Sequence, residues 1–189
     1  MFDTGFVQQN AKPVMEGEFM SSFVLGVTRD GRALLTLEKR GNETKLAIPG
    51  GKAMAGENSF ATAARGAHEE SGGALSEMTR LRIARGAGVR GQVEFNSAIA
   101  VLHDLVVPAD NDVELRFDKQ EATRLRAASE KAAVQHTIGK KKRPTKKKAT
   151  EQLDLVFVSL ADLRSQQWRE KSMFSFPHSV LAARLMKFI

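Results

Sequence analysis

The stretch "GGKAMAGENSFATAARGAHEESGG", residues 50–73, says more about the fold than any other part of this 189-residue chain. Glycine pairs stand at both ends, and the alanine-rich segment between them favours a helix. Apolar residues recur there at the spacing i, i+3, i+4, i+7, at Phe60, Ala63, Ala64 and Ala67. This period predicts a helix over about residues 58–71 with one apolar face, ending at Gly72.

A second face of the predicted helix carries charge. Arg65 and Glu69 are four residues apart, and so are Gly66 and Glu70, which puts these positions in one patch. Two adjacent carboxylates offer only oxygen acceptors, which suit a hard cation such as Mg²⁺ or Mn²⁺. Mg²⁺ usually binds one or two protein carboxylates and completes its shell with water and phosphate oxygens. A glutamate pair alone is also typical of a solvated helix face, so the interpretation depends on the joint spacing.

That joint spacing resembles the Nudix box. The family pattern is G, five residues, E, seven residues, R-E, an apolar residue, any residue, E-E, any residue, G. The matching positions here are Gly51, Glu57, Arg65, Ala67, Glu69, Glu70 and Gly72. One position departs from the pattern, because Gly66 stands where the family has a glutamate that is a principal metal ligand and often the general base. The departure puts hydrolysis in question, but not the fold.

The resemblance implies an α/β fold, a Nudix-like α/β/α sandwich with a mixed β-sheet. It also implies Mg²⁺ or Mn²⁺ as cofactor, with Glu69 and Glu70 as metal ligands in the catalytic site. The backbone carbonyl of Gly51 is then a further ligand, since glycine permits the close backbone path that this contact needs. Glu57 would support Arg65 by an ion pair, and Arg65 would orient a metal-binding carboxylate.

Replacement of the box glutamate by Gly66 removes one negative charge and two oxygens from the patch. Glu151 is the best candidate to substitute as catalytic residue and metal ligand, because it precedes an apolar run that predicts a strand. Many Nudix enzymes place a late catalytic glutamate in the loop before such a strand. An ordinary polar residue at a strand entrance explains Glu151 equally well. Weaker candidates lie between the strands, at Glu114, Asp118 and Glu121.

The sequence predicts a single domain over residues 1–189, with a polar insertion at about 108–150. Residues 21–40 predict a hairpin with Asp30-Gly31 at its turn, and residues 45–51 predict a short strand that enters the box loop. The other predicted elements are strands over 79–89 and 93–107 that pair antiparallel through a join at 88–91, a weakly amphipathic helix over 118–136, a strand over 153–160 and a closing helix over 177–189.

The basic charge is concentrated in one segment. The chain has a formal net charge of +7. Seven basic residues lie together inside the insertion: Lys140, Lys141, Lys142, Arg143, Lys146, Lys147 and Lys148. This run could bind RNA or another polyanion through phosphates, act as a nuclear-import signal, steer anionic nucleotides to the site, or be a solvated loop. No aromatic residue interrupts it, so base stacking is not supported.

Composition bears on the cellular location. The chain has no cysteine, which excludes disulfides and thiolate chemistry. Its first residues lack a basic start followed by an apolar core, and no apolar run approaches the ~18 residues that cross a bilayer. We therefore expect an intracellular, cytoplasmic protein with no membrane partner, or a nuclear one if the host is eukaryotic.

These observations support two functional hypotheses. The first is a metal-dependent pyrophosphohydrolase of the Nudix type that cleaves a nucleoside diphosphate linked to another group, including an RNA-linked group such as a 5′ cap. The second is a catalytically impaired Nudix-fold protein that binds nucleotide or RNA without turnover. Expected partners are a nucleotide or nucleotide-linked substrate, RNA through the basic run, and a second copy of the chain in a homodimer, as is common among Nudix proteins.

Overall fold

The structure is a computed structural model that describes residues 21–75, 88–95, 98–107, 116–136, 150–172, 174 and 184–189. Several sequence-based predictions concern residues outside these ranges. They are the basic run over 140–148, most of the strand over 79–89 and most of the closing helix over 177–189. Among the helices that are described, none is long and apolar enough to cross a membrane.

The described strands form one seven-stranded mixed sheet. Their bounds are β1 Ser21–Thr28, β2 Arg32–Arg40, β3 Glu43–Ala47, β4 Gly50–Lys52, β5 Val89–Phe95, β6 Ala98–Val107 and β7 Thr150–Ser159. The strand order is β3-β2-β1-β6-β5, with β4 also paired to β1 and β7 also paired to β2. The β1–β6 pair is parallel and the other pairs are antiparallel.

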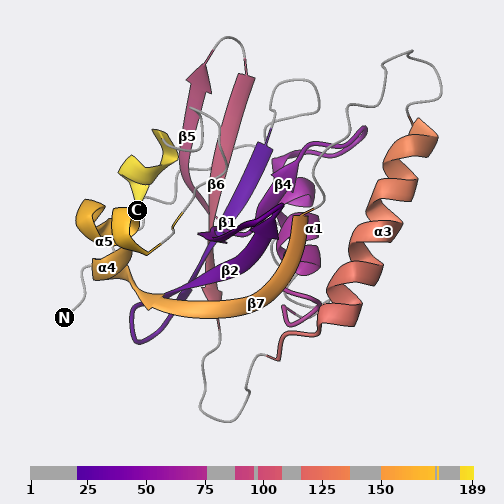
Figure 1. Cartoon of the computed structure of the whole chain (residues 1–189). Coiled ribbons are helices and arrows are strands. Elements are labelled where there is room, and N and C mark those ends of the chain that lie inside the picture. Colours follow the sequence, from indigo (N-terminus) through magenta and orange to yellow (C-terminus); the bar gives the residue numbers. More distant parts are fainter. Residues whose placement is uncertain are drawn as a thin grey trace.

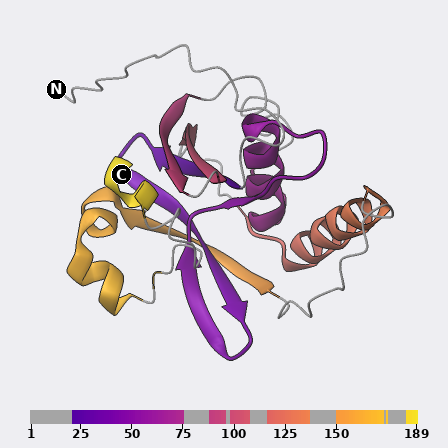
Figure 2. The same ribbon diagram turned by 90° about the horizontal axis from the view of Figure 1, so that it is seen from above.

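Helices lie on both sides of this sheet (Figures 1 and 2). The described helical segments are α1 Ser59–Glu70, α3 Lys119–His136, α4 Leu160–Arg164, α5 Gln166–Lys171 and the 3₁₀ turn Met186–Phe188. Seen from above, α1 and α3 lie on one side, and α4 and α5 lie on the other with the C-terminal turn (Figure 2). The expected α/β fold, a Nudix-like α/β/α sandwich with a mixed sheet, is therefore confirmed.

Helix α1 forms where the sequence predicts it. Asn58 caps its N-terminus, because the Asn58 side chain accepts a hydrogen bond of 2.9 Å from the amide of Ala61. The chain leaves the helix through Gly72, whose φ of +60° is costly for other residues. The predicted apolar face is confirmed by its buried residues, which are Phe60, Ala63, Ala64 and Ala67.

The sheet separates two apolar clusters, because successive side chains of a strand point to opposite faces. On β2, Leu34 packs in the cluster that contains the alanines of α1. Its neighbour Leu35 packs in the other cluster, with Leu163 of α4 and Leu185 near the C-terminus. The even-numbered residues of β2 therefore face α1. The odd-numbered residues up to Leu37 face the layer that contains α4.

The predicted hairpin over 21–40 and the helix over 118–136 are confirmed by β1, β2 and α3. The predicted join at 88–91 is wrong. Residues 89–95 are strand β5, which pairs antiparallel with β6 up to Phe95 opposite Ala98. The glycine pattern was misleading because Gly91 lies at a strand irregularity, where an added Cβ would come 2.2 Å from the ring of Phe188.

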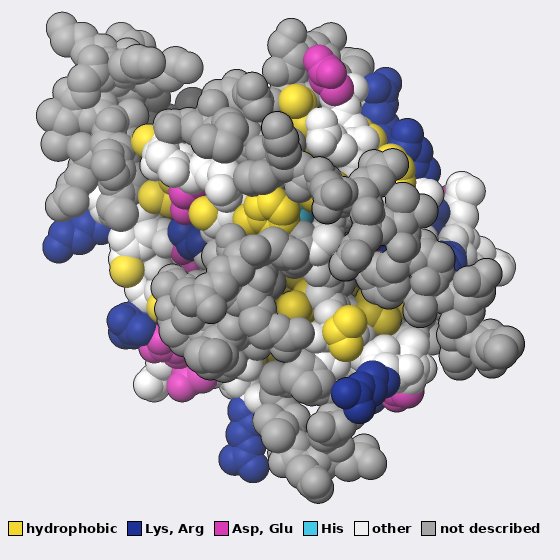
Figure 3. Space-filling model, turned by 180° about the vertical axis from the view of Figure 1, so that it is seen from behind, with side chains coloured by type: hydrophobic (Ala, Val, Ile, Leu, Met, Phe, Trp, Pro, Cys, Tyr) yellow, Lys and Arg dark blue, Asp and Glu magenta, His cyan; other side chains and the backbone are white. Residues whose placement is uncertain are grey.

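On the face that Figure 3 shows, the positive charge of the described residues is not gathered in one place. Seen from behind, the Lys and Arg side chains of the described surface lie at several separate positions around its edge (Figure 3). The net charge of +7 includes the basic run over 140–148, which belongs to the residues that the structure does not describe.

Candidate functional site

The box loop lies directly against α1 at Gly66. A Cβ added to Gly66 would come 2.4 Å from the carbonyl carbon of Gly50, 2.5 Å from its oxygen and 2.8 Å from the amide nitrogen of Gly51. These are backbone atoms, which cannot turn aside as a flexible side chain can. With this backbone arrangement, the glutamate of the family pattern has no room at position 66. Gly66 is therefore the residue that lets β4 approach the helix.

Arg65 and Glu57 form a two-pronged ion pair. Arg65 Nε donates to Glu57 Oε1 at 2.7 Å, and Arg65 Nη2 donates to Glu57 Oε2 at 3.0 Å. Nη2 also donates to the carbonyl of Lys52 at 2.7 Å, so the arginine ties α1 to the box loop. Burial raises the pKa of Glu57, but the hydrogen bonds from Arg65 and Thr62 outweigh it and the net pKa is lowered. The support expected between these two residues is present, and it keeps Glu57 ionised.

The carboxylate of Glu69 links α1, to which this residue belongs, with α3. Its carboxylate accepts a hydrogen bond from the hydroxyl of Ser129 in α3, and Arg65 Nη1 lies 3.5 Å from its other oxygen. Burial raises the pKa of Glu69 despite these contacts. The insertion helix thus reaches the box directly, which no pattern within the insertion indicated.

Glu70 turns toward the box loop. Its carboxylate accepts a hydrogen bond of 3.0 Å from the amide of Gly50. Part of the residue reaches the surface, but the carboxylate itself is enclosed. Burial raises the pKa of Glu70 to about 8, and the negative charge of Glu38 adds to the effect. Without a bound cation, Glu70 therefore carries a proton at neutral pH, and a cation placed beside it would restore its charge.

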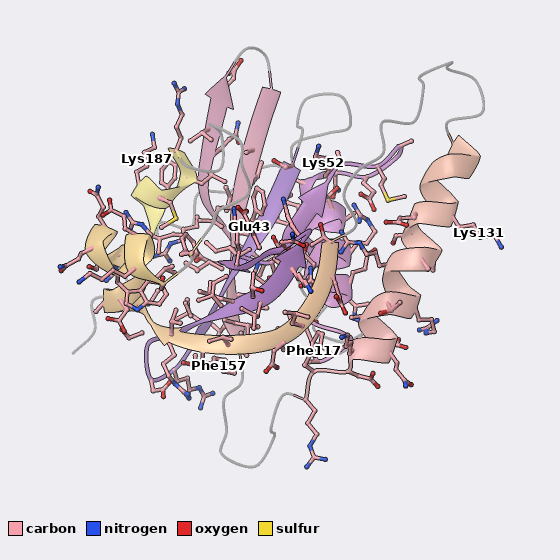
Figure 4. All side chains as sticks on the ribbon, viewed as in Figure 1. Glu43, Lys52, Phe117, Lys131, Phe157 and Lys187 are labelled. Carbon is pink, nitrogen blue, oxygen red and sulfur yellow. The ribbon has the colours of Figure 1, made fainter. Side chains whose placement is uncertain are left out.

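Helix α3 covers this corner through polar contacts. Arg126 donates to the carbonyl of Thr150 at 2.7 Å, and its positive charge acts on Glu70. Of the α3 residues whose burial is described, only Ala122 is buried. Lys131 points away from the body of the protein (Figure 4). The described part of α3 therefore docks with little apolar burial and with polar contacts to β7 and α1.

Glu151 lies within β7, as its second residue, rather than in a loop before it. It is exposed and pairs with Lys119 of α3 at 2.7 Å. The hydrogen bond from Lys119 lowers the pKa of Glu151. Asp118 caps α3, accepting from the amides of Gln120 and Glu121.

The other weaker candidates differ in their placement. Glu121 is paired with Arg124, whose Nε donates to it at 2.7 Å. Glu114 lies outside the described residues. Asp118 and Glu121 therefore have local roles at the start of α3, as a cap and as an ion-pair partner.

Sequence analysis did not identify Glu38 as a site residue. It is 2% exposed and lies on β2, on the face that Leu34 presents to α1. The strand register puts Glu38 opposite Gln152 of β7, which is 6% exposed. Arg40 Nε lies 2.9 Å from Glu38 Oε1, at an angle that makes an ion pair and no hydrogen bond. The available signal was the alternation of Leu34, Thr36 and Glu38, which puts an acid at a buried position.

Whether these residues fit a divalent cation depends on donor chemistry and on arrangement. The acids offer hard oxygen donors, and the buried Oε1 of Gln152 has no hydrogen-bond partner within the described part of the chain. Both features fit Mg²⁺ or Mn²⁺ at Glu70. No three His, Cys, Asp or Glu side chains among the described residues are gathered as a complete metal site, since Glu69 and Glu70 turn to different partners. Gly51 lies beside Arg65 and Gly66.

Comparison with known proteins gives only distant matches. No family model matches the sequence, and no curated protein matches it significantly. Two solved structures are similar: the MutT protein from Methanosarcina mazei Go1 has 19% identity over 94% of this chain and 91% of that chain, with a TM-score of 0.47. The E. coli ORF135 protein has 18% identity over 89% and 90%, with a TM-score of 0.38. At these values, conclusions about the site rest on this chain's own residues.

Substituting Gly66 by alanine tests the packing of the box loop. Gly66→Ala should lower the free energy of unfolding by about 1–3 kcal/mol through overpacking, even though alanine favours a helix by up to about 1 kcal/mol. Gly88→Ala is the matched control, because an added Cβ there meets nothing within 4 Å. Denaturant unfolding of both variants measures the difference. Equal stability of the two variants would contradict the close contact.

The pKa of Glu70 predicts a pH-dependent stability of the metal-free protein. The folded-state pKa of about 8 lies above the ordinary value of 4.5, so the folded state binds the proton more tightly. This contribution is fully present below pH 4.5 and is lost as the pH rises through 8, with a slope of up to about 1.4 kcal/mol per pH unit. Glu70→Gln should flatten the slope between pH 5 and 8 in chemical unfolding with a metal chelator. Superimposable wild-type and variant profiles would reject the raised pKa.

Proposed function

We propose that this chain is a metal-dependent pyrophosphohydrolase of the Nudix type that cleaves a nucleoside diphosphate linked to another group. The observation that carries the proposal is the enclosed carboxylate of Glu70, which is bound to the amide of Gly50 and has a raised pKa. A protein gains nothing in stability from burying this acid with Glu38 nearby, because both burial and a like charge oppose ionisation. Such unfavourable burial of titratable groups is typical of functional sites.

The residues have separate parts in the proposed reaction. Glu69 and Glu70 bind the ion, aided by the carbonyl of Gly51, while the Arg65–Glu57 pair fixes the loop and helix that carry them. Glu151 can join the ligands only by leaving Lys119. When bound, Mg²⁺ or Mn²⁺ neutralises phosphate charge and acidifies a water for attack at phosphorus.

Helix α3 contacts one of the proposed ligands. The hydroxyl of Ser129 donates to one carboxylate oxygen of Glu69, which keeps a second lone pair on that oxygen for a cation. Arg126 lies at the same corner and supplies positive charge beside the acids. We propose that Ser129 and Arg126 bind phosphate oxygens at this corner, since a guanidinium is a strong donor to phosphate.

A second candidate function is nucleotide binding without turnover. The observation that favours it is the packing at Gly66, which excludes the family's glutamate in this backbone arrangement. The engagement of Glu69 by Arg65 and Ser129 points the same way. In this alternative, the site binds the diphosphate but lacks a general base.

Replacing one acid by its amide tests hydrolysis. Glu70→Gln should lower kcat/KM by at least about 100-fold, or ~3 kcal/mol of transition-state stabilisation, on nucleoside diphosphate-linked substrates with Mg²⁺ or Mn²⁺. Glu170→Gln on α5 is the matched control, because this exposed glutamate lies on the other side of the sheet. Release of nucleotide is measured for a panel of substrates. If the wild type turns over substrate no faster than a Glu69→Gln/Glu70→Gln variant, the hydrolase proposal fails. The alternative, nucleotide binding without turnover, is then tested by calorimetry with a nonhydrolysable nucleotide.

The basic run over 140–148 is proposed to bind the RNA body of an RNA-linked substrate. Seven cations in nine residues would contact successive phosphates, and such contacts weaken as salt rises. Deleting residues 140–148 should lower kcat/KM on capped RNA by at least about tenfold and reduce its salt dependence. Free dinucleotide substrates provide the internal control and should change less than about twofold. An equal loss on both substrates would reject RNA binding by this segment.

A further inference from the structure

Two polar side chains meet on the α1 face of the sheet, at the end of β2. Glu38 lies on the same face of this strand as Leu34, which packs against the alanines of α1. Gln152 of β7 is the direct neighbour of Glu38 across the strand pair. The register shifts between Leu37 and Glu38, and this irregularity keeps both polar residues on the buried face.

These buried groups are poorly satisfied by protein contacts. Gln152 Nε2 lies 3.5 Å from Glu38 Oε2, at the outer limit of a hydrogen bond. Arg40 pairs with Glu38 by charge without a hydrogen bond. The oxygen of the Gln152 amide has no hydrogen-bond partner within the residues that the structure describes. A buried carboxylate and a buried amide oxygen both need partners, so this arrangement calls for a further ligand.

The ligand that fits is a cation. Glu38 and Glu70 lie on β2 and α1, whose residues Leu34 and Ala67 pack in one cluster, so both carboxylates lie on the α1 side of the sheet. The carboxylate of Glu38 and the amide oxygen of Gln152 lack a full set of hydrogen bonds, and Arg40 Nε also lacks one. Two arginines also lie at this place. The side chain of Arg40 is partly exposed to solvent, and Arg126 donates a hydrogen bond to the carbonyl of Thr150. Oxygen donors in a small enclosed group are typical of a hard divalent ion.

We infer that Glu38 is the further carboxylate ligand of the divalent cation, beside Glu70 and the amide oxygen of Gln152. The inference rests on the proposed function, because it assigns a ligand to the same cation. It explains how the chain dispenses with a glutamate at position 66. The carboxylate oxygens that a glutamate at position 66 would supply come instead from Glu38 on β2. Gly66 lets the box loop pack against α1.

Glu38 fits this role better than Glu151. Glu38 is 2% exposed and lies on the face of β2 that Leu34 presents to α1. Glu151 is exposed, is paired with Lys119 and lies opposite Lys39 in the strand register. Gln152, the next residue of β7, is buried and lies directly opposite Glu38 in the strand pair.

Direct measurement of Mn²⁺ binding to the full chain tests the inference without substrate. Titration followed by electron paramagnetic resonance reports free Mn²⁺, and calorimetry gives the affinity. Glu38→Gln should weaken Mn²⁺ binding at least tenfold, while Glu170→Gln on α5 should leave it within twofold of wild type. Wild-type affinity in Glu38→Gln would overturn the inference. So would a loss of affinity in Glu151→Gln with none in Glu38→Gln.

A second variant guards against misfolding. Gln152→Met has nearly the same size but lacks the amide oxygen, and it should weaken Mn²⁺ binding by about three- to tenfold. Circular dichroism identifies any variant that does not fold. If Glu38→Gln does not fold, Gln152→Met decides, and wild-type affinity in that variant overturns the inference.

The outcomes also separate this inference from the proposed function. If the wild type hydrolyses nucleotides and Glu38→Gln binds Mn²⁺ normally, only the ligand assignment fails. If Mn²⁺ binding depends on Glu38 but no substrate is turned over, the ligand assignment stands and the hydrolase proposal fails.

Discussion

The site depends on the contact between the backbone of Gly50-Gly51 and α1 at Gly66. Atoms of the loop come so close to Gly66 that no side chain fits between them. Because the loop lies there, the amide of Gly50 reaches the carboxylate of Glu70, and the carbonyl of Lys52 reaches Arg65. One glycine therefore determines where both the acid and the arginine are held. The same contact excludes the acid that the Nudix pattern has at this position.

Much of this fold could be predicted from the sequence, because local signals and tertiary packing agree there. The alanine-rich period of α1 and the Asp30-Gly31 turn are each encoded within a few residues. The join at 88–91 was wrongly predicted, since glycine marks an irregular strand as readily as a turn. The short helices α4 and α5 were not predicted, because five or six residues are too few to show a period.

The site was predictable only where its residues share one helix and loop. Glu57 and Arg65 lie eight residues apart, and their ion pair follows from the spacing. Glu38 is far from the box in sequence and is buried on the face of β2 that Leu34 presents to α1, so no spacing along the chain reveals it. Ser129 reaches Glu69 from an insertion whose docking depends on polar contacts. Long-range contacts of this kind are set by strand register and helix docking, which a single sequence does not encode locally.

The central claim is that a divalent cation binds on the sheet side of Glu70, across from Gly66. A crystal structure of the full chain with Mn²⁺, with data collected to locate anomalous scattering, tests it most directly. We predict one anomalous peak within coordination distance of Glu70 and Glu38, with Gly50-Gly51 still packed on Gly66. A peak bound by Glu151 without Glu38, or no peak at saturating Mn²⁺ while Glu70 stays bonded to Gly50, would contradict the account.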